Sequence, residues 1–313
     1  MRKNIFLLSL VVLYVGQLFK CNALNWCNNK QTNGKFYITE PCPFDSDLIL
    51  QTGELEIIGF VNASINVTHI AILRKDTTKR HRFFTILEQA KLILKYIRLE
   101  GGDVSRFSVA KIRDTEELGG AILLNGRKTS LIAYKSSFVL NKATNGGAIY
   151  SRYGNVIVIG TNFEACESKH NGAEGGDGAA IFVSDSTLQI TDGSTIKNNR
   201  AIDSFGGAVM VASGSQLSLV QSSVESNYAF IGGGGIFCAT NSICSIAQSV
   251  IQLNTVDPNS MYIQMDIPTK GVHCDYGAVC TVDDLSSARK ADCKIGFFGD
   301  YESVCASCHY SCE

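Results

Sequence analysis

Gly119-Gly120-Ala121-Ile122 is the first of five similar stretches that decide the fold of this 313-residue chain. The others are Gly146-Gly147-Ala148-Ile149, Gly178-Ala179-Ala180-Ile181, Gly206-Gly207-Ala208-Val209 and Gly233-Gly234-Gly235-Ile236. Successive stretches begin 27, 32, 28 and 27 residues apart. A period of this size is typical of repeat proteins, in which each unit buries its apolar face by stacking on its neighbours.

A second motif recurs with the same period: an aromatic or aliphatic residue, two further residues, then Asn. Its copies are Phe138-Val139-Leu140-Asn141, Phe163-Glu164-Ala165-Cys166, Ile196-Lys197-Asn198-Asn199, Val224-Glu225-Ser226-Asn227 and Ile251-Gln252-Leu253-Asn254, so Cys166 stands where the others have Asn. Between the motifs, apolar residues alternate at period two, and the chain has 29 Gly but only 4 Pro. This pattern predicts many short strands joined by tight corners.

Stacking explains why equivalent positions carry similar side chains. If each unit forms one coil, residues one unit apart lie about 4.8 Å apart along the axis. We expect an inward ladder of Ile122, Ile149, Ile181, Val209 and Ile236, and an amide ladder of Asn141, Asn199, Asn227 and Asn254. Asn suits a repeated corner because it tolerates left-handed torsions and its amide can bond to the next amide. The predicted fold is all-β, a three-sided right-handed parallel β-helix over residues 83–260.

The two motifs resemble the repeats of the polymorphic outer membrane proteins first described in chlamydiae. The resemblance covers roughly residues 84–254, and Cys166 departs from it by replacing an Asn. It implies a right-handed β-helix of the pectin-lyase-like kind and a role in adhesion at a cell surface.

Residues 1–23 have the pattern of a secretory signal peptide. Arg2 and Lys3 precede an apolar run over residues 5–16, and small residues end the segment at Ala23. This run is shorter than the roughly 18 apolar residues that a membrane-spanning helix needs, and no other run reaches that length. We therefore expect a secreted or cell-surface chain without a membrane span once the leader is removed. An uncleaved signal anchor is the alternative.

The segments on either side of the repeats differ from them in composition. Residues 24–82 lack the repeat and are expected to form an N-terminal cap on the open edge of the first coil. Asn62 and Asn66 lie there in Asn-x-Ser/Thr sequons and are candidate glycosylation sites. Residues 261–313 are expected to form a cysteine-rich tail. Its stretch Cys293-Lys294-Ile295-Gly296-Phe297-Phe298-Gly299-Asp300, followed by Cys305, Cys308 and Cys312, is similar to the cysteine-rich modules of ephrin-receptor and growth-factor-receptor type. That similarity implies a small, disulfide-stapled module at this end.

Twelve cysteines suit a disulfide framework in an exported chain. Spacing alone does not determine the pairing. Near neighbours suggest Cys27 with Cys42, Cys238 with Cys244, Cys274 with Cys280, and two bonds among Cys293, Cys305, Cys308 and Cys312. Cys166 is then left over, and its place among the asparagines predicts a buried, unreactive thiol.

No catalytic constellation is visible in the repeats. Their acidic residues fall at different phases of the unit and are not expected to form a column: Glu164, Glu167, Glu174, Asp177, Asp185, Asp192, Asp203 and Glu225. Lyase chemistry would need clustered carboxylates for calcium and a base beside them. We expect neither a cofactor nor a metal. Once the leader is removed, 25 basic residues remain against 29 acidic ones, so no electrostatic basis for binding nucleic acid exists.

The first functional hypothesis is a secreted or cell-surface, non-catalytic adhesion or scaffold protein. Its β-helix rod would bind a cell-surface protein or glycan, with the loop at residues 168–177 as a candidate contact. A carbohydrate-active enzyme, lyase or hydrolase, is the second; it predicts acids and a basic residue from adjacent coils on one face. A truncated receptor ectodomain is the third.

Overall fold

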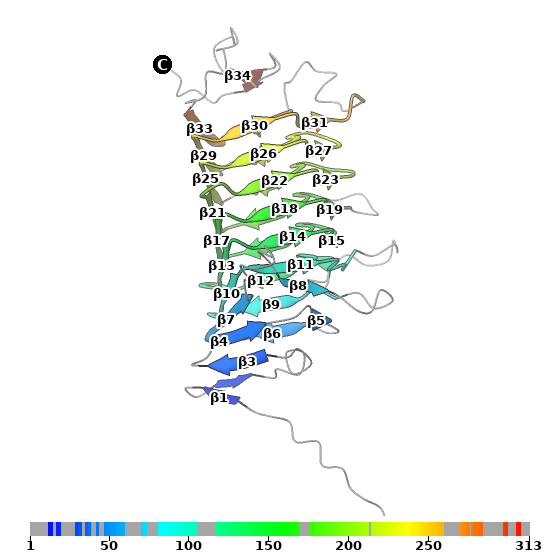
Figure 1. Cartoon of the computed structure of the whole chain (residues 1–313). Helices are drawn as coiled ribbons and strands as arrows, with labels where there is room; N and C mark the ends of the chain where they lie inside the picture. Colours follow the sequence, from blue (N-terminus) through cyan, green and yellow to red (C-terminus); the bar gives the residue numbers. More distant parts are fainter. Residues whose placement is uncertain are drawn as a thin grey trace, which may run out of the picture.

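The computed structural model describes residues 12–14, 17–19, 29–32, 35–38, 42–43, 47–59, 70–73, 81–105, 117–169, 176–212, 214–259, 270–275, 277–283, 297–299 and 305–307. These residues are all-β, with no α-helix among them. Figure 1 shows their strands stacked in coils, rising from the blue end of the chain to the orange end. The part of the chain that is described therefore has no helix of the length and hydrophobicity needed to cross a membrane.

The largest sheet has ten strands, and we call it the β10 sheet. In order it contains β3 (Asn29–Thr32), β4 (Lys35–Ile38), β7 (Glu54–Gly59), β10 (Lys91–Lys95), β13 (Ser130–Tyr134), β17 (Asn155–Ile159), β21 (Thr187–Thr191), β25 (Gln216–Val220), β29 (Ile243–Ala247) and β33 (Val279–Asp283). The β3–β4 pair is antiparallel and every later neighbour is parallel. From β4 to β33 this sheet extends roughly 38 Å at the usual strand spacing.

Two further parallel sheets have eight strands each. The β11 sheet contains β5 (Cys42–Pro43), β8 (Ile70–Leu73), β11 (Ile97–Glu100), β14 (Ser137–Val139), β18 (Asn162–Glu164), β22 (Thr195–Lys197), β26 (Ser223–Glu225) and β30 (Val250–Gln252). The β12 sheet contains β6 (Leu48–Leu50), β9 (Phe84–Leu87), β12 (Ile122–Asn125), β16 (Ile149–Arg152), β20 (Ile181–Ser184), β24 (Val209–Val211), β28 (Ile236–Cys238) and β32 (Val272–Cys274).

A fourth parallel sheet is made of two-residue strands, and we call it the β15 sheet. It contains β15 (Lys142–Ala143), β19 (Glu167–Ser168), β23 (Arg200–Ala201), β27 (Tyr228–Ala229) and β31 (Thr255–Val256). Two antiparallel pairs complete the described strands: β1 (Val12–Tyr14) with β2 (Gln17–Phe19), and β34 (Phe297–Gly299) with β35 (Cys305–Ser307). The β1–β2 pair falls within the residues that the sequence marks as a leader.

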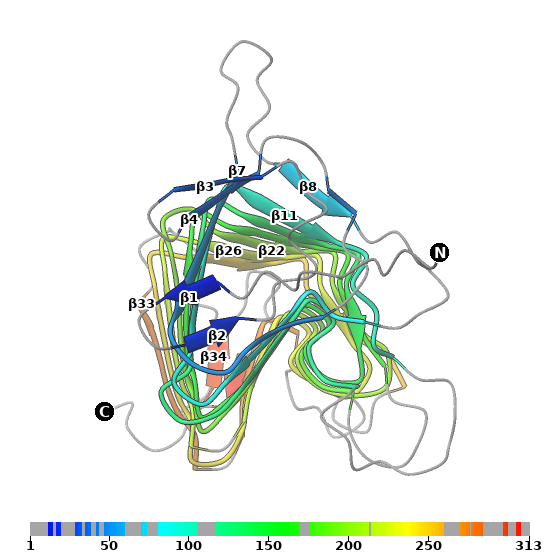
Figure 2. The same cartoon turned by 90° about the horizontal axis from the view of Figure 1, so that it is seen from below.

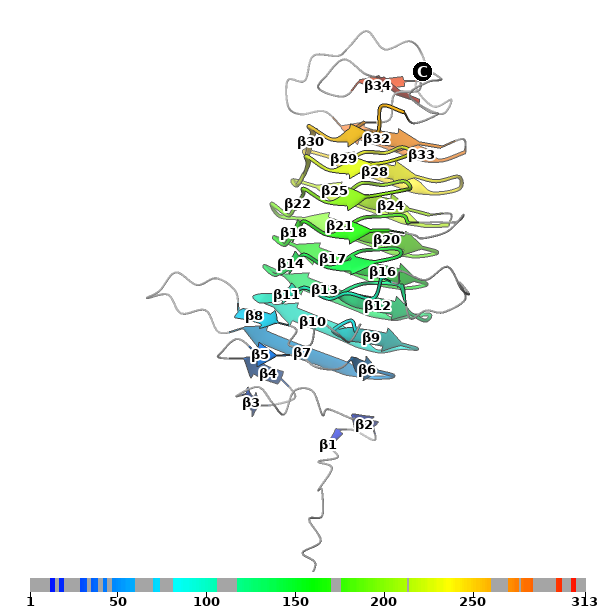
Figure 3. The ribbon, with the colours of Figure 1, turned by 90° about the vertical axis from the view of Figure 1, so that its right-hand side faces the viewer.

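The coils from β13 onward pass through the four sheets in the same order, as β13, β14, β15 and β16 do, whereas the described strands of the earlier coils visit only the three larger sheets. Viewed along the stack, the strands of successive coils lie over one another around one interior (Figure 2). Figure 3 shows the same stacking from the side, with β9, β12, β16, β20, β24 and β28 following one another along the β12 sheet. The parallel-coil arrangement matches the predicted fold, but a full repeat has four strands rather than three, because the short β15 strand follows the asparagine motif.

The aliphatic ladder lies in the core as predicted. Its five residues pair in register along the β12 sheet and are 0% exposed: Ile122, Ile149, Ile181, Val209 and Ile236. In the β11 sheet, the rings of Phe138 and Phe163 stack with centroids 4.7 Å apart. Like packs on like because each coil presents the same inward positions to the next.

The parallel sheets extend beyond the predicted range of 83–260 at both ends. On the N-terminal side, β4, β6 and β7 join the same sheets, although residues 24–82 lack the glycine motif. Their alternate residues, such as Leu48, Leu50, Leu55 and Ile57, are buried like those of the repeats. On the other side, β32 and β33 add a further coil. Apolar alternation is sufficient for a strand to join the stack without the repeat motif.

Glycine is required at the first position of each motif stretch by the backbone. Gly119, Gly146, Gly178, Gly206 and Gly233 all have positive φ angles, between 61° and 69°. At the second position, Ala179 replaces Gly and is fully buried. The left-handed backbone at the first position therefore requires glycine more strictly than the close packing at the second position does.

Candidate binding faces

None of the outward strand residues of the β10 sheet is charged from β13 to β29, although Lys135, which directly follows β13, holds its Nζ 5.4 Å from the ring centroid of Tyr134. Alternate residues of these strands point outward because those between them, such as Leu131, Val156 and Leu188, are buried. The outward residues are Ser130, Ile132, Tyr134, Asn155, Ile157, Ile159, Thr187, Gln189, Thr191, Gln216, Ser218, Val220, Ile243, Ser245 and Ala247. We call this surface the polar platform. It measures about 19 Å across the strands and about 13 Å along them.

Hydroxyl and amide groups dominate the exposed part of the platform. Thr187, Gln189, Gln216 and Ser245 are exposed, and Thr187 Oγ1 donates a hydrogen bond to Asn155 Oδ1 at 2.6 Å. Ile243 adds an exposed aliphatic side chain at 46%. The strand residues of this surface can therefore offer hydrogen-bond donors and acceptors and some apolar contact, and they bring no ion of their own to desolvate.

On the N-terminal side of the platform, the charged side chains of β4, β7 and β10 pair with one another, and on its other side β33 ends in Asp283. Glu56 lies between Lys35 at 3.0 Å and Lys95 at 2.7 Å, and Glu54 contacts Lys91 at 2.9 Å. Burial alone would raise the pKa of Glu56, but hydrogen bonds and charge from Lys95 and Lys35 lower it below its usual value. The platform thus begins where this ion-pair network ends.

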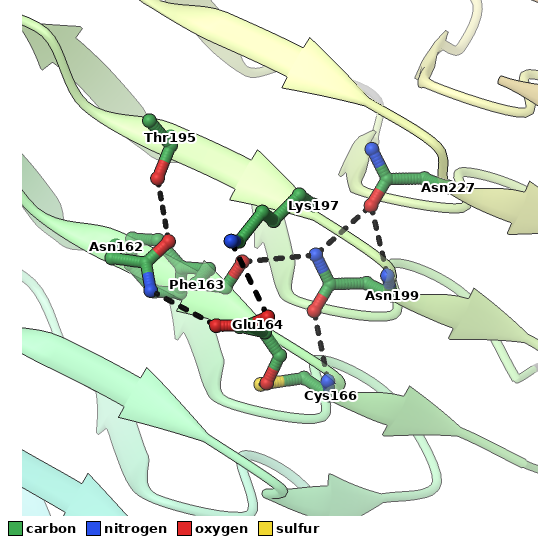
Figure 4. Close-up of polar contacts among 8 residues, drawn as sticks. All are labelled: Asn162, Phe163, Glu164, Cys166, Thr195, Lys197, Asn199 and Asn227. Carbon is green, nitrogen blue, oxygen red and sulfur yellow. Dashed lines mark hydrogen bonds and ion pairs between the residues drawn. The ribbon is translucent and has the colours of Figure 1, made fainter. Parts of the chain in front are cut away.

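The outer face of the β11 sheet is different, because it carries a charged and polar cluster (Figure 4). Thr195 Oγ1 donates to Asn162 Oδ1 at 2.5 Å, and Asn162 Nδ2 donates to Glu164 Oε2 at 3.5 Å. Lys197 Nζ lies 3.4 Å from Glu164 Oε1. These side chains come from β18 and β22, so the cluster links two adjacent coils.

The expectation that no acids share a column is wrong for two of them. Glu164, Lys197 and Glu225 occupy equivalent positions of β18, β22 and β26. The signal was present in the sequence, because each of the three residues directly follows the first residue of the asparagine motif. A mixed column of acid, base and acid is therefore present on this face.

Three of the predicted asparagines, Asn199, Asn227 and Asn254, form an unbroken ladder inside the stack, and Figure 4 shows the contact between Asn199 and Asn227. Asn227 Oδ1 accepts from the Asn199 backbone at 3.0 Å and from Asn199 Nδ2 at 2.9 Å. Asn254 Oδ1 accepts in the same way from Asn227, at 3.0 Å in both bonds. Each amide nitrogen also donates to a main-chain carbonyl of the previous coil, as Asn227 does to Ile196 at 2.9 Å. The ladder satisfies buried backbone groups and leaves no amide for a ligand.

The left-handed residue of this corner is not the asparagine, contrary to the sequence-based expectation. Positive φ angles occur at the residue before each ladder position: Leu140, Ala165, Asn198, Ser226 and Leu253. The ladder side chain must point inward to reach its neighbours, so the residue before it makes the turn.

Cys166 occupies the asparagine position of its coil and is buried and free, as predicted. Its thiol donates to the Phe138 carbonyl at 3.6 Å, the bond that an asparagine amide makes elsewhere, and its backbone N–H donates to Asn199 Oδ1 at 2.8 Å. Burial raises the pKa of the Cys166 thiol to about 12, an effect that hydrogen bonds from Asn141 only partly offset. A thiol that stays protonated is a poor nucleophile.

Replacing Cys166 by Asn should complete the ladder and stabilise the protein. The new amide oxygen would accept from the Asn141 backbone, as Asn227 accepts from Asn199, and the new amide nitrogen would replace the thiol on Phe138. We expect the free energy of unfolding to rise by about 1 kcal/mol. Urea denaturation should rank the residues at position 166, from most to least stable protein, as Asn, then the natural Cys, then Ala. An Asn variant less stable than the wild type would contradict it, because the site would then be too small for the amide.

A second apolar ladder runs along the outside of the β12 sheet. It consists of Leu123, Tyr150, Phe182, Met210 and Phe237, each at most 9% exposed, and continues to His273, which stacks on Phe237 at 4.7 Å. Leu118 and Phe205 pack against it. Burial raises the pKa of Tyr150. This ladder, which follows each glycine stretch by one residue, is an outer core and not a free binding surface.

The candidate contact loop is anchored at both described ends. Ser168 Oγ donates to the Gly176 carbonyl, and the Asp177 carboxylate accepts from the Ser204 hydroxyl and from the Phe205 amide. Residues 170–175, which include Glu174, lie outside the described residues. So do Asn62, Asn66, Cys27, Cys293, Cys308, Cys312 and the side chains of Cys42 and Cys305.

Two of the suggested disulfides are present, Cys238–Cys244 and Cys274–Cys280. Both join the end of a β12-sheet strand to the following β10-sheet strand across one corner of a coil.

Comparison of the chain with protein families, with curated proteins and with solved structures finds no match. Any functional argument therefore rests on the faces described above.

Proposed function

We propose that this chain is a secreted or cell-surface, non-catalytic adhesion or scaffold protein whose polar platform binds an uncharged region of a cell-surface glycan or protein. The coils are, on this proposal, right-handed, since a connection between parallel strands of one sheet is right-handed in nearly all proteins. The basic-then-apolar leader and the disulfides support export.

The absence of charge from the outward positions of five successive strands of the β10 sheet, β13 to β29, carries this proposal. The neighbouring surfaces do contain charges: ion pairs occupy β7 and β10, and Lys197 pairs with Glu164 on the β11 sheet. An uncharged strip between them favours a partner that supplies hydroxyl or amide groups, because neither side must desolvate an ion. Since the strands already hold these side chains at fixed spacing, binding would cost little ordering entropy.

A charge-insertion experiment tests this assignment. Gln189 and Ser218 are cross-strand neighbours on the platform, and Thr195 and Ser223 are cross-strand neighbours on the β11 sheet. Changing either pair to Glu adds the same charge in the same geometry. Binding to intact cells and to an array of neutral glycans should weaken at least about tenfold, or 1.4 kcal/mol, for Gln189→Glu/Ser218→Glu. The Thr195→Glu/Ser223→Glu control should remain within about twofold of wild type, since surface changes outside a binding face have small effects.

Two results would overturn the proposal. Equal binding by both variants would remove the platform from the argument. A wild-type protein that binds neither cells nor any glycan of the array would remove adhesion itself.

The Glu164–Lys197–Glu225 column supports a second candidate, a carbohydrate-active enzyme. Equivalent positions two coils apart are separated by about 9.6 Å, close to the upper end of the roughly 6.5 to 9.5 Å between the carboxyl groups of inverting glycosidases. This candidate ranks second because Lys197, the base of the column, and Glu164, one of its two acids, form an ion pair with each other. Neither group is then available to a substrate. Release of reducing ends from polyuronates or neutral glycans, abolished by Glu225→Gln, would favour the enzyme.

A further inference from the structure

The two described disulfides are stacked directly on each other. Cys238 pairs in register with Cys274 between β28 and β32, and Cys244 pairs with Cys280 between β29 and β33. Each disulfide closes the same corner of its coil, with a sequence separation of 6 residues. The four cysteines therefore form a two-by-two array, one disulfide in each of two consecutive coils.

Three sulfur atoms of this array converge. The Sγ atoms of Cys238, Cys244 and Cys280 all lie within 4.8 Å of one another, so the sulfur of one disulfide is close to both sulfurs of the next. Cys274 does not belong to this group of three.

The two disulfides also differ in their access to solvent. Cys238 and Cys244 are 0% exposed, whereas Cys280 is partly exposed and Cys274 is almost buried. A reagent in solution can therefore reach the array through Cys280. The Cys238–Cys244 bond, which we call the inner disulfide, has no sulfur at the surface.

We propose that the stacked disulfides form a thiol-exchange site that a dithiol enters at Cys280. A thiolate of the dithiol attacks Cys280 Sγ, and Cys274 leaves as a thiolate that is then protonated. The second thiol of the reagent, after losing its proton, attacks the reagent's own sulfur in the mixed disulfide. Cys280 is released as a thiolate, and the reagent is oxidised to its disulfide with loss of two electrons.

The inward step follows from the convergence of the three sulfurs. The Cys280 thiolate attacks Cys244 Sγ, a Cys244–Cys280 bond forms, and the Cys238–Cys244 bond breaks with Cys238 leaving as a thiolate. This exchange needs no further electrons. It makes the buried disulfide responsive to a reductant that cannot touch it, and it replaces a bond within one coil by a bond between two coils.

Two matched variants of the full chain test the step without any reductant. Cys274→Ser leaves Cys280 as the free thiol, inside the group of three sulfurs. Cys280→Ser leaves Cys274 as the free thiol, outside that group. Both variants lose the same disulfide. After incubation at about pH 8, where an accessible thiol is partly ionised, free thiols are alkylated and disulfide-linked peptides are identified by mass spectrometry.

Cys274→Ser should yield a Cys244–Cys280 peptide and an alkylated Cys238, with rearranged links at least about tenfold more abundant than in Cys280→Ser, because exchange follows the proximity of the attacking sulfur. Wild-type protein treated with one equivalent of dithiothreitol should yield the same Cys244–Cys280 peptide. The proposal is overturned if Cys274→Ser keeps only the Cys238–Cys244 bond, or if both variants rearrange equally. The wild-type measurement keeps the test decisive if a variant fails to fold: absence of the Cys244–Cys280 peptide there overturns it as well.

Discussion

Replacing Asn227 by Leu should lower the free energy of unfolding by about 3 kcal/mol. The Asn227 side chain is fully buried and takes part in four hydrogen bonds, two to Asn199, one to Ile196 and one to Asn254. Leu has a similar size but no polar group, so the Asn199 backbone N–H and the Ile196 carbonyl would lose these partners inside the stack. A buried polar group without a partner costs far more than the hydrogen bond contributes net.

Asn155→Leu is the matched control for this variant. Asn155 is also an asparagine, and the next residue of its strand, Val156, points into the core. The Asn155 side chain instead lies on the polar platform and accepts one hydrogen bond, from Thr187. We expect a change of less than about 0.5 kcal/mol there. Urea denaturation followed by circular dichroism measures both. If the two variants lost equal stability, the amide ladder would not be a main source of stability for the stack.

Gly146→Ala should destabilise the protein by at least about 3 kcal/mol, since two costs add. Gly146 has a φ of 61°, a conformation that L-residues with a Cβ adopt reluctantly. A Cβ there would also lie 2.1 Å from the Ile149 carbonyl oxygen, far inside van der Waals contact. That oxygen belongs to the backbone of β16, so it cannot move without disturbing the ladder.

Gly193→Ala separates the two costs. Gly193 also has a positive φ, 74°, but a Cβ there would meet no heavy atom within 4 Å. Its loss should be about 1 to 2 kcal/mol, the cost of the left-handed backbone alone. Thermal denaturation of both variants measures the difference. Similar losses for the two would show that the backbone can relax around Gly146, and that the glycine motif is needed only for its torsion.

The repeat itself could be recognised without coordinates because its causes are local. Period-two alternation selects strands, and a glycine before each strand allows the left-handed corner. Near-identical residues one unit apart can meet only if the units stack. For the same reason Cys166 could be placed in the interior: its position within the asparagine motif determines which way it points. The Cys238–Cys244 and Cys274–Cys280 bonds, which near-neighbour spacing suggested but did not determine, are present because each pair lies at one corner of a coil.

The sequence by itself thus determined the stacking of parallel coils and the composition of the buried ladders. Only the tertiary structure decided which residues of different coils share a surface or meet in space: the uncharged platform, and the convergence of Cys280 on the Cys238–Cys244 disulfide. It also brought β4, β5, β6 and β7 into the sheets. The physical reason is that alternation depends on adjacent residues, whereas register depends on strands from different coils. Units of 27 to 32 residues absorb their differences in the turns, so the alignment of columns becomes visible only when the coils lie on one another.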